Sequence, residues 1–253
     1  DFLTNLGIKN GKLGISIPYM DESGAVVSTR QRYAPNSPIR FSWNKGSRVI
    51  PYGLWLLKHI KEQGYVVLVE GESDAHTLWL HDIPALGIPG ASTFQESWVD
   101  YLEGLKVYVH KEPENSGEVF TQRIYRALHE KQFTNKVYQI SINGCKDPSE
   151  LYISDCEHFL DRWKAVMEAA REIDISKFEI KPEEVIKNAP VRLRIPAGWR
   201  VSANGIEYLN DKSGLWVLIC RTPILLNRRL KSLDTGEEKM EIAFLRDEKW
   251  HTY

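Results

Sequence analysis

Hydrophobic and polar residues alternate over residues 12–33, on both sides of the turn-forming segment Asp-Glu-Ser-Gly at 21–24. Alternation with a period of two is typical of half-buried strands. Gly24 is suited to the positive φ of a tight turn, so we predict a β-hairpin here. Residues 34–48 are rich in turn formers and predict an ordered loop.

The pattern changes after residue 64, where short, fully apolar segments alternate with helical ones. We predict strands at 65–70, 85–90, 105–110 and 136–142, with helices near 73–81 and from about residue 117. Such alternation indicates a parallel sheet covered by helices on both faces. A later helix is predicted to bury Phe159, Leu160, Trp163, Val166 and Met167 after a capping-box pair, Ser154 and Glu157.

The rhythm is lost over 173–190, which is charged, and alternation resumes beyond it around turn signals at 210–214 and 234–237. We therefore predict an α/β fold with three parts, the last two of which are joined by a linker. An N-terminal mixed α/β hairpin subdomain (1–62) precedes a parallel sheet flanked by helices (63–172). The linker (173–190) leads to a small C-terminal β-rich domain (191–253).

The composition, with 42% hydrophobic and 26% charged residues, is that of an ordinary globular protein. A formal net charge of -1 removes any whole-protein argument for nucleic-acid binding, so such a role must rest on local basic patches. Cys145, Cys156 and Cys220 form no CxxC pair, and no signal peptide or membrane span is readable, so we expect a cytoplasmic location. Because the sequence starts at Asp1, we expect a fragment of a longer chain.

Acidic residues follow three of the predicted strands. Glu70, Glu72 and Asp74 come at the end of the first, Glu112 and Glu114 follow the strand at 105–110, and Asp147 follows the one at 136–142. In parallel sheets, ligands bind beyond the carboxyl ends of the strands. Carboxylates gathered at one edge repel one another unless a cation offsets the charge, and Mg²⁺ prefers oxygen ligands of this kind.

Each acid also has a purely structural explanation. The negative charge of Glu70 could interact favourably with the positive, amino-terminal end of the following helix dipole. Glu112 and Glu114 could belong to a solvated turn around Pro113, and Asp147 before Pro148 is a common way to begin a helix. Recurrence at successive strand ends favours a metal site, although the sequence does not show that these strands are neighbours.

Three segments together, VVLVEGESDAHTL at 66–78, EPENSG at 112–117 and KDPSE at 146–150, resemble the TOPRIM domain of bacterial-type primases, topoisomerases and some nucleases. The resemblance implies that Glu70 is the conserved glutamate of this family and that Asp147 is its third acid. Glu112 and Glu114 take the place of an Asp-x-Asp pair, each with one extra methylene. Asp74 falls where primases carry an additional, supporting aspartate.

The segment before the first strand resembles the amino-terminal half of bacterial-type primase cores, through Arg32-Tyr33, the Asn-Ser-Pro at 36–38, the Trp-Asn-Lys-Gly at 43–46 and the Tyr-Gly-Leu at 52–54. This match extends from about residue 12 to 155. We expect this region to bind template or nucleotide, because cationic side chains hold phosphates and aromatic rings stack on unpaired bases. The candidate binding residues are Arg30, Arg32, Tyr33, Asn36, Arg40, Trp43, Lys45 and Arg48. A basic cluster can also be an ordinary solvated face.

The resemblance implies an enzyme, a DNA primase that synthesises RNA primers on single-stranded DNA from nucleoside triphosphates by two-metal chemistry with Mg²⁺ or Mn²⁺. Glu70, Glu112, Glu114 and Asp147 are the expected metal-binding acids. Residues 191–253 resemble the start of a domain that precedes helicase modules in primase-helicases of phages and mobile elements, so a helicase module in the same longer chain or in trans is an expected partner. The alternatives are a TOPRIM nuclease and a catalytically degenerate single-stranded-DNA-binding module that loads a helicase.

Overall fold

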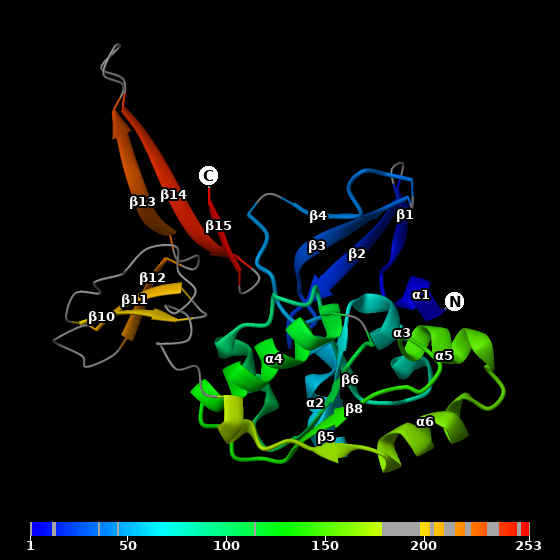
Figure 1. Ribbon diagram of the computed structural model, residues 1–253. Helices are drawn as coiled ribbons and strands as arrows, with labels where there is room; N and C mark the ends of the chain where they lie inside the picture. The colour runs from blue at the N-terminus through cyan, green and yellow to red at the C-terminus, as the bar shows by residue number, and fades with distance from the viewer. Residues whose placement is uncertain are drawn as a thin grey trace. The chain divides into compact units, whose positions relative to one another are not determined.

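The protein is described by a computed structural model in which the chain forms two compact units, residues 1–178 and 179–253 (Figure 1). The structure describes residues 2–11, 14–34, 36–44, 46–113, 115–178, 198–202, 205–209, 216–220, 224–231, 238–246 and 249–252. Within these ranges, no helix is both long enough and apolar enough to cross a membrane. The fold is mixed α/β, as the sequence predicts.

The first unit opens with an antiparallel sheet of four strands in the order β1-β2-β3-β4. Its elements are α1 (Phe2–Asn5), β1 (Lys9–Gly11), β2 (Gly14–Met20), β3 (Val26–Tyr33) and β4 (Phe41–Trp43). The predicted hairpin is confirmed as β2 and β3, with Gly24 at a φ of 82° in the turn. The Asp21 carboxylate stabilises this turn, because it accepts hydrogen bonds from the backbone amides of Ser23 and Ala25. The predicted loop at 34–48 contains one strand, β4, which pairs with β3.

The central sheet has five strands in the order β6-β5-β7-β8-β9. They are β5 (Tyr65–Glu70), β6 (Ala85–Ile88), β7 (Lys106–His110), β8 (Val137–Ile140) and β9 (Arg171–Glu172). The first four are parallel, as predicted, while the short β9 runs antiparallel to β8 at one edge. Strand β7 therefore lies between β5 and β8, so the carboxyl ends of these three strands are neighbours.

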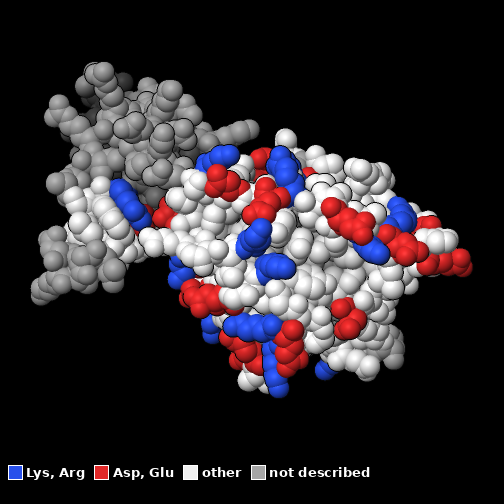
Figure 2. Space-filling view, turned by 90° about the horizontal axis from the view of Figure 1, so that it is seen from below, with Lys and Arg blue, Asp and Glu red and all other residues white. Residues whose placement is uncertain are grey.

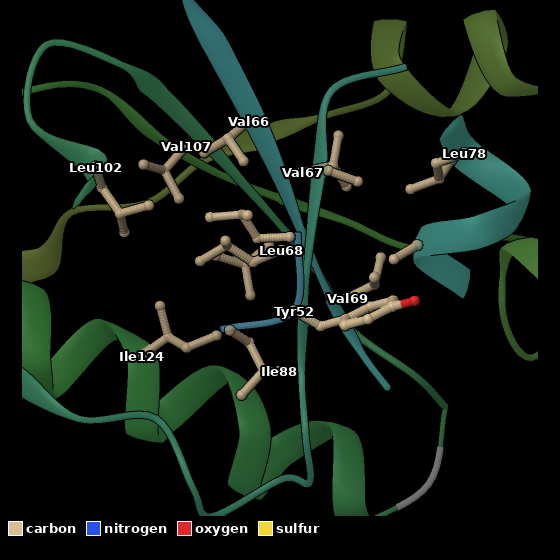
Figure 3. Packing of buried hydrophobic residues seen from close by; sticks show 14 of the residues in the cluster. Tyr52, Val66, Val67, Leu68, Val69, Leu78, Ile88, Leu102, Val107 and Ile124 are labelled. Atoms are coloured by element: carbon tan, nitrogen blue, oxygen red, sulfur yellow. The ribbon is translucent and has the colours of Figure 1, made fainter. Parts of the chain in front are cut away.

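Helices cover both faces of this sheet. They are η1 (Leu54–Leu56), α2 (Leu57–Gln63), α3 (Glu72–Leu80), η2 (Glu96–Leu102), α4 (Asn115–Glu130), α5 (Pro148–Ser154), α6 (Phe159–Glu168) and η3 (Ile175–Phe178). Successive residues of β5 point to opposite sides, as expected for a strand. Figure 3 shows Val67 on the side of Leu78 from α3, and Leu68 on the side of Ile124 from α4. All four side chains are essentially buried, which explains why the strand is apolar throughout.

The predicted start of α6 is wrong. Ser154 is the last residue of α5, and its hydroxyl donates to the carbonyl oxygen of Leu151 (2.9 Å) rather than capping α6. Helix α6 begins after His158, which caps it without a side-chain hydrogen bond. Its buried face contains Phe159 and Trp163, whereas Leu160 is 56% exposed.

The two edge strands of the central sheet, β6 and β9, differ in what lies beside them. Beside β6, Tyr52 and Gly87 form an antiparallel bridge in which each backbone amide donates to the other carbonyl oxygen (2.8 and 2.9 Å). At the other edge, β9 pairs with β8. The Tyr52 ring is fully buried and packs against Tyr19 of β2, with ring centroids 4.9 Å apart. The amino-terminal segment is therefore packed against the central sheet rather than joined to it by a free linker.

The second unit contains two separate antiparallel sheets of three strands each. The first consists of β10 (Trp199–Ser202), β11 (Gly205–Leu209) and β12 (Trp216–Cys220), and the second of β13 (Ile224–Lys231), β14 (Glu238–Arg246) and β15 (Lys249–Thr252). The β-rich character predicted for this part is confirmed. The two predicted turns at 210–214 and 234–237 lie outside the described residues.

Candidate active site

The carboxyl ends of β5, β7 and β8 bring together acids that are far apart in the sequence. Glu70 is the last residue of β5, and Glu112 lies two residues beyond β7. Asp147 follows β8 and is the N-cap of α5, where its carboxylate accepts a hydrogen bond from the backbone amide of Glu150 (2.8 Å). Glu114, also expected at this edge, lies outside the described residues.

Among the described residues, Asp74, Glu112 and Asp147 form a close group of acids. Each offers a carboxylate oxygen, and these oxygens all lie within 4.8 Å of one another. Asp74, on the first turn of α3, is 3% exposed. Burial and the charge of Asp147 raise the pKa of Asp74 to about 7, against the opposing effect of hydrogen bonds from Ser149. The group therefore carries an unfavourable concentration of negative charge that a cation would relieve.

Glu70 adds a fourth acid beside this group. Its Oε2 atom is buried and has no hydrogen-bond partner among the described residues. Burial and the charge of Glu112 raise the pKa of Glu70, while Lys146, the backbone amide of Ala91 and Arg30 lower it. A buried carboxylate oxygen without a donor is costly, which makes it a candidate for contact with a bound group.

Lys146 supplies a positive charge from within the chain. Its Nζ atom lies 3.2 Å from Glu112 Oε2, and its side chain is 46% exposed, against 8% for that of Glu112. The ion pair offsets part of the negative charge of the site. Sequence reasoning did not select this lysine, although it directly precedes Asp147.

Ser149 orients Asp74. Its hydroxyl and its backbone amide both donate to Asp74 Oδ1, at 2.7 and 3.3 Å, and its hydroxyl also contacts the hydroxyl of Thr77 (3.2 Å). Ser149 lies on α5, and Asp74 and Thr77 lie on α3. These bonds hold the two helices together at the acidic edge. No sequence signal identified Ser149, because its partner is 75 positions away.

Gly117 controls the position of Glu112. A Cβ atom at this position in the first turn of α4 would collide with the backbone nitrogen and carbonyl oxygen of Glu112. The close approach of a helix backbone to the residue bearing the acid therefore requires glycine.

The donor set fits a hard divalent cation. Asp74, Glu112 and Asp147 offer carboxylate oxygens only, and Glu70 adds a further oxygen without a donor. Mg²⁺ and Mn²⁺ prefer such oxygen ligands and keep part of their water or substrate phosphate in the remaining positions. Burial, and after it the charge of Asp147, raises the pKa of Asp74, and perturbed acids of this kind often occur at functional sites.

Three of the predicted nucleic-acid-binding residues come together on the amino-terminal sheet. Arg32, Tyr33 and Arg40 line a small hollow with Ala34 and Phe41. The side chains of Arg32 and Arg40 are exposed, and the Tyr33 hydroxyl contacts that of Ser42 (2.9 Å). The charge of Arg32 also reaches α3, where it opposes protonation of His76, whose pKa is lowered to about 4 mainly by burial.

Of the other predicted binding residues, those that the structure describes do not line this hollow. Arg48 lies near the opposite end of the hairpin, where its charge adds to the hydrogen bond from Ser23 in lowering the pKa of Asp21. Asn36 is exposed on the loop before β4, and Lys45 lies outside the described residues. Trp43 packs its ring edge-to-face on Tyr19, with centroids 4.8 Å apart, so part of its surface serves the core.

Arg30 requires a correction. The sequence predicts a phosphate-binding arginine, but this residue is only 8% exposed. Its Nη1 atom donates to Glu72 Oε1 (2.8 Å), and its guanidinium lies 4.1 Å from the ring centroid of Phe41. Alternation along β3 turns Arg30 inward, and α3 supplies the buried carboxylate that pairs with it. Its charge is therefore not available to a phosphate at the surface.

Charges on the outer surface are mixed. Figure 2 shows Lys and Arg interspersed with Asp and Glu over the face in view. This agrees with the near-neutral formal charge of the chain. Recognition of a polyanion by the described part of the protein must therefore depend on local groups such as Arg32 and Arg40.

Comparison with solved structures identifies bacterial primase catalytic cores as structural neighbours. The Aquifex aeolicus primase structure of the zinc-binding and RNA polymerase domains gives a TM-score of 0.54 at 20% identity, covering 69% of this chain and 42% of that one. A DnaG primase catalytic domain bound to single-stranded DNA gives 0.54 at 16% identity, covering 70% and 59%. A DNA primase domain from Pseudomonas aeruginosa gives 0.55 at 15% identity, covering 75% and 64%.

These similarities establish that the chain shares the fold of such cores. It spans 42% to 64% of the length of the three neighbouring structures. No family model matches the sequence. No curated protein matches it either.

Proposed function

We propose that this chain is the catalytic part of a primase-like nucleotidyltransferase that synthesises RNA primers on single-stranded DNA. The observation that carries the proposal is the convergence of Asp74, Glu112 and Asp147 within 4.8 Å at the carboxyl edge of a parallel sheet. The fold shared with primase catalytic cores, one of them described with single-stranded DNA bound, supports the same reading. On its resemblance to the start of a helicase-associated domain, the carboxyl-terminal part is proposed to connect the core to a helicase module of a phage or mobile-element protein.

In this proposal, Asp74, Glu112 and Asp147 hold Mg²⁺ or Mn²⁺, with Glu114 as a further ligand. Bound cations would supply Lewis-acid activation of the attacking 3′ hydroxyl and charge stabilisation of the departing pyrophosphate. Lys146 offsets part of the charge of Glu112 until a cation binds, since its Nζ atom lies 3.2 Å from that carboxylate. Ser149 holds Asp74 Oδ1 by two hydrogen bonds, so that its other oxygen remains available.

Glu70 is assigned to proton transfer. Its Oε2 atom has no hydrogen-bond partner among the described residues, and burial raises its pKa, which makes the ionised carboxylate a stronger base. In this assignment Oε2 takes the proton of the attacking hydroxyl as its oxygen forms a bond to the α-phosphorus, and the bond to pyrophosphate breaks. Arg32 and Arg40, exposed on the neighbouring sheet, bind phosphates of the template or of the incoming nucleotide.

The test is template-dependent synthesis of ribonucleotide products by the full-length protein on single-stranded DNA, with Mg²⁺ or Mn²⁺. Glu112→Gln and Asp74→Asn should each lower turnover by at least about a hundredfold, because each removes a charge that the metal needs. Glu118→Gln is the matched control, because it makes the same chemical change at an acid that pairs with Lys111 on the surface. Its turnover should stay within about twofold of the parent protein.

The other outcomes identify the alternatives. Metal-dependent cutting of DNA without nucleoside triphosphates, lost in Glu112→Gln, would assign the same acids to a nuclease. Binding of single-stranded DNA that is indifferent to this substitution, with no product of either kind, would assign the chain to a non-enzymatic binding module. Primer synthesis that survives Glu112→Gln would contradict the proposed site itself.

A further inference from the structure

A buried ion pair joins the amino-terminal sheet to the helix that carries the acidic site. Arg30 on β3 donates to Glu72 on the first turn of α3 at 2.8 Å, and the side chains are 10% and 6% exposed. The two residues are 42 positions apart in the sequence. Glu72 is also flanked by two acids of the site, since Glu70 precedes it by two positions and Asp74 follows it by two.

Each member of the pair has a further contact on the amino-terminal sheet, although the buried Nε atom of Arg30 has no hydrogen-bond partner among the described residues. Glu72 Oε1 also accepts a hydrogen bond from the Tyr19 hydroxyl of β2 (2.5 Å), so both strands of the hairpin reach the same carboxylate. On the other side, the Arg30 guanidinium lies over the ring of Phe41 on β4, 4.1 Å from its centroid. Residues from three of the four strands of the amino-terminal sheet therefore contact either Glu72 Oε1 or the guanidinium of Arg30.

Strand β3 carries both the buried Arg30 and the exposed Arg32. Arg32 follows Arg30 by two residues, so the two side chains lie on the same face of the strand. Arg30 points into the interface with α3, and Arg32 is exposed at the hollow that it lines with Tyr33 and Arg40. Any shift of β3 against α3 moves Arg32 relative to Glu70 and Asp74 by the same amount.

We propose that Arg30 and Glu72 act as a positioning pair, which fixes the sheet bearing the exposed arginines in register with the acidic edge of the central sheet. Buried ion pairs are weak sources of stability, because desolvation offsets their attraction, but they can select one register among several. Neither residue is assigned here to substrate or metal. The proposal rests on the proposed function, because the purpose of the register is to align phosphate-binding and metal-binding groups on one substrate.

The central variant replaces all three polar groups, as Tyr19→Phe, Arg30→Met and Glu72→Met together, so that no buried polar partner is left alone. The control variant removes an ion pair of the same unit that lies on the surface, Lys136→Gln with Glu172→Gln, whose side chains are 59% and 55% exposed. Both variants should fold, and melting temperature and Mn²⁺ affinity should stay close to those of the parent protein. Because the four acids are untouched, Mn²⁺ affinity should change by less than about twofold.

A distance measurement tests the register independently of any activity. Spin labels on cysteines introduced at Val26 of β3 and Leu160 of α6, both exposed, report by pulsed electron resonance the distance between the amino-terminal sheet and this helix. Cys156 and Cys220 are replaced by serine in this background, and Cys145 is buried. The parent protein and the control variant should give one narrow distribution, and the triple variant a broadened or shifted one.

Oligonucleotide binding and steady-state kinetics test whether the register aligns the exposed arginines with the acidic site. Fluorescence anisotropy with a labelled single-stranded oligonucleotide should show affinity at least tenfold weaker in the triple variant, with KM for template raised more than turnover is lowered. A distance distribution as narrow as that of the parent protein, with oligonucleotide affinity within twofold, would overturn the proposal. If the triple variant fails to fold, Glu72→Gln replaces it, because glutamine keeps a hydrogen-bond acceptor but removes the charge. This variant should broaden or shift the distance distribution and weaken oligonucleotide affinity by about threefold. If neither changes, the proposal is overturned as well.

The two proposals fail separately. If the parent protein binds no single-stranded DNA and makes no primer, the proposed function is wrong, while the spin-label distances still decide whether the pair sets the register. If primers are made and the distances do not change in the variants, only the positioning role is wrong.

Discussion

Asp74 is the residue at which pH should act on the site. Its pKa of about 7 compares with an ordinary value of 3.8, mainly because it is buried and next because Asp147 is near. The folded state therefore favours the protonated form, and the contribution of this group to stability without metal falls as pH rises between these two values. A cation must displace the same proton, so metal affinity should rise over that range.

The first prediction is that Mn²⁺ affinity increases by about fivefold between pH 6 and pH 7 and levels off above pH 8, because the ionised fraction of Asp74 changes in this way for a pKa of about 7. Isothermal titration calorimetry at several pH values measures this, and buffers of different ionisation enthalpy report the released proton. Asp74→Asn should weaken binding and flatten the dependence. Affinity that is constant from pH 6 to pH 8 in the parent protein would show that Asp74 is ionised before metal arrives.

Lys146 should compete with the metal. Its ammonium group lies 3.2 Å from Glu112 and is partly exposed, so the pair contributes at most about 1 kcal/mol. We predict that Lys146→Met tightens Mn²⁺ binding by about threefold, as measured by the decrease of the free Mn²⁺ electron resonance signal. Lys131→Met, which breaks a surface pair with Asp100, is the control and should have no effect. Weaker binding in Lys146→Met would instead mean that the lysine orients Glu112.

Sequence reasoning found the acids but not the residues that hold them. Glu70, Glu112 and Asp147 were identifiable because each lies at the end of a predicted apolar strand or in the segment that follows one. Ser149 and Lys146 were missed, because a polar residue beside a motif does not indicate which distant carboxylate it contacts. Arg30 was assigned to phosphate binding, because the sequence shows a basic cluster but not the inward orientation that pairs this arginine with Glu72.

At the scale of elements, Asp147 has two separable roles. Its carboxylate caps α5 by accepting from the amide of Glu150, and it also belongs to the acidic group. Asparagine caps a helix about as well as aspartate does, whereas alanine costs about 1 kcal/mol. We predict that Asp147→Asn retains the parent's thermal stability but loses Mn²⁺ binding. Asp147→Ala should lose both, as calorimetric unfolding and metal titration will show. Equal stability of the two variants would contradict the capping role.

The junction between β7 and α4 is expected to be equally sensitive. Because a Cβ at Gly117 would collide with the backbone of Glu112, Gly117→Ala should displace that backbone and cost about 1–3 kcal/mol of unfolding free energy. Mn²⁺ affinity should fall with it. Ser116→Ala in the same helical turn is the matched control, and chemical denaturation compares the two. A Gly117→Ala variant as stable as the control, with unchanged Mn²⁺ affinity, would refute this account of the junction.

Periodicity predicted the elements of the central sheet well, because its strands are short, apolar and separated by helices. It did not predict strand order, which decides that β7 lies between β5 and β8. The boundary between α5 and α6 was also missed, since Ser154 and Glu157 have the spacing of a capping box while the chain turns elsewhere. Local hydrophobic patterns indicate which segments form helices and strands, whereas tertiary packing decides which of these elements lie next to one another.

At the scale of the molecule, the first unit should fold alone. The chain divides between Phe178 and Glu179, and the Phe178 ring packs on Tyr125 of α4 with centroids 4.9 Å apart. We predict that a fragment of residues 1–178 unfolds cooperatively and binds Mn²⁺ as the whole chain does. A fragment ending at residue 170 should be clearly less stable, because it lacks β9 and η3. Circular dichroism with thermal melting compares the two fragments, and similar melting temperatures would contradict the boundary.

The overall architecture was predictable in class, because hairpin, alternating and β-rich patterns occupy separate regions of the sequence. The packing of the amino-terminal hairpin against α3 was not, since it depends on Tyr19, Arg30 and Glu72 meeting across 53 positions. Contacts between residues so far apart have no local signature. They are nonetheless what places Arg32 beside the helix that begins at the acidic edge.

The antiparallel bridge between Tyr52 and Gly87 also affects whether copies of the protein associate through the edges of their sheets. An open edge of a sheet is a template on which a strand of another copy can add, and this is a common route to aggregation. At β6 the two inter-backbone hydrogen bonds of the bridge occupy part of that template, and the opposite edge strand, β9, is only two residues long. Copies of the protein crowded at high local concentration are thereby discouraged from joining through their central sheets.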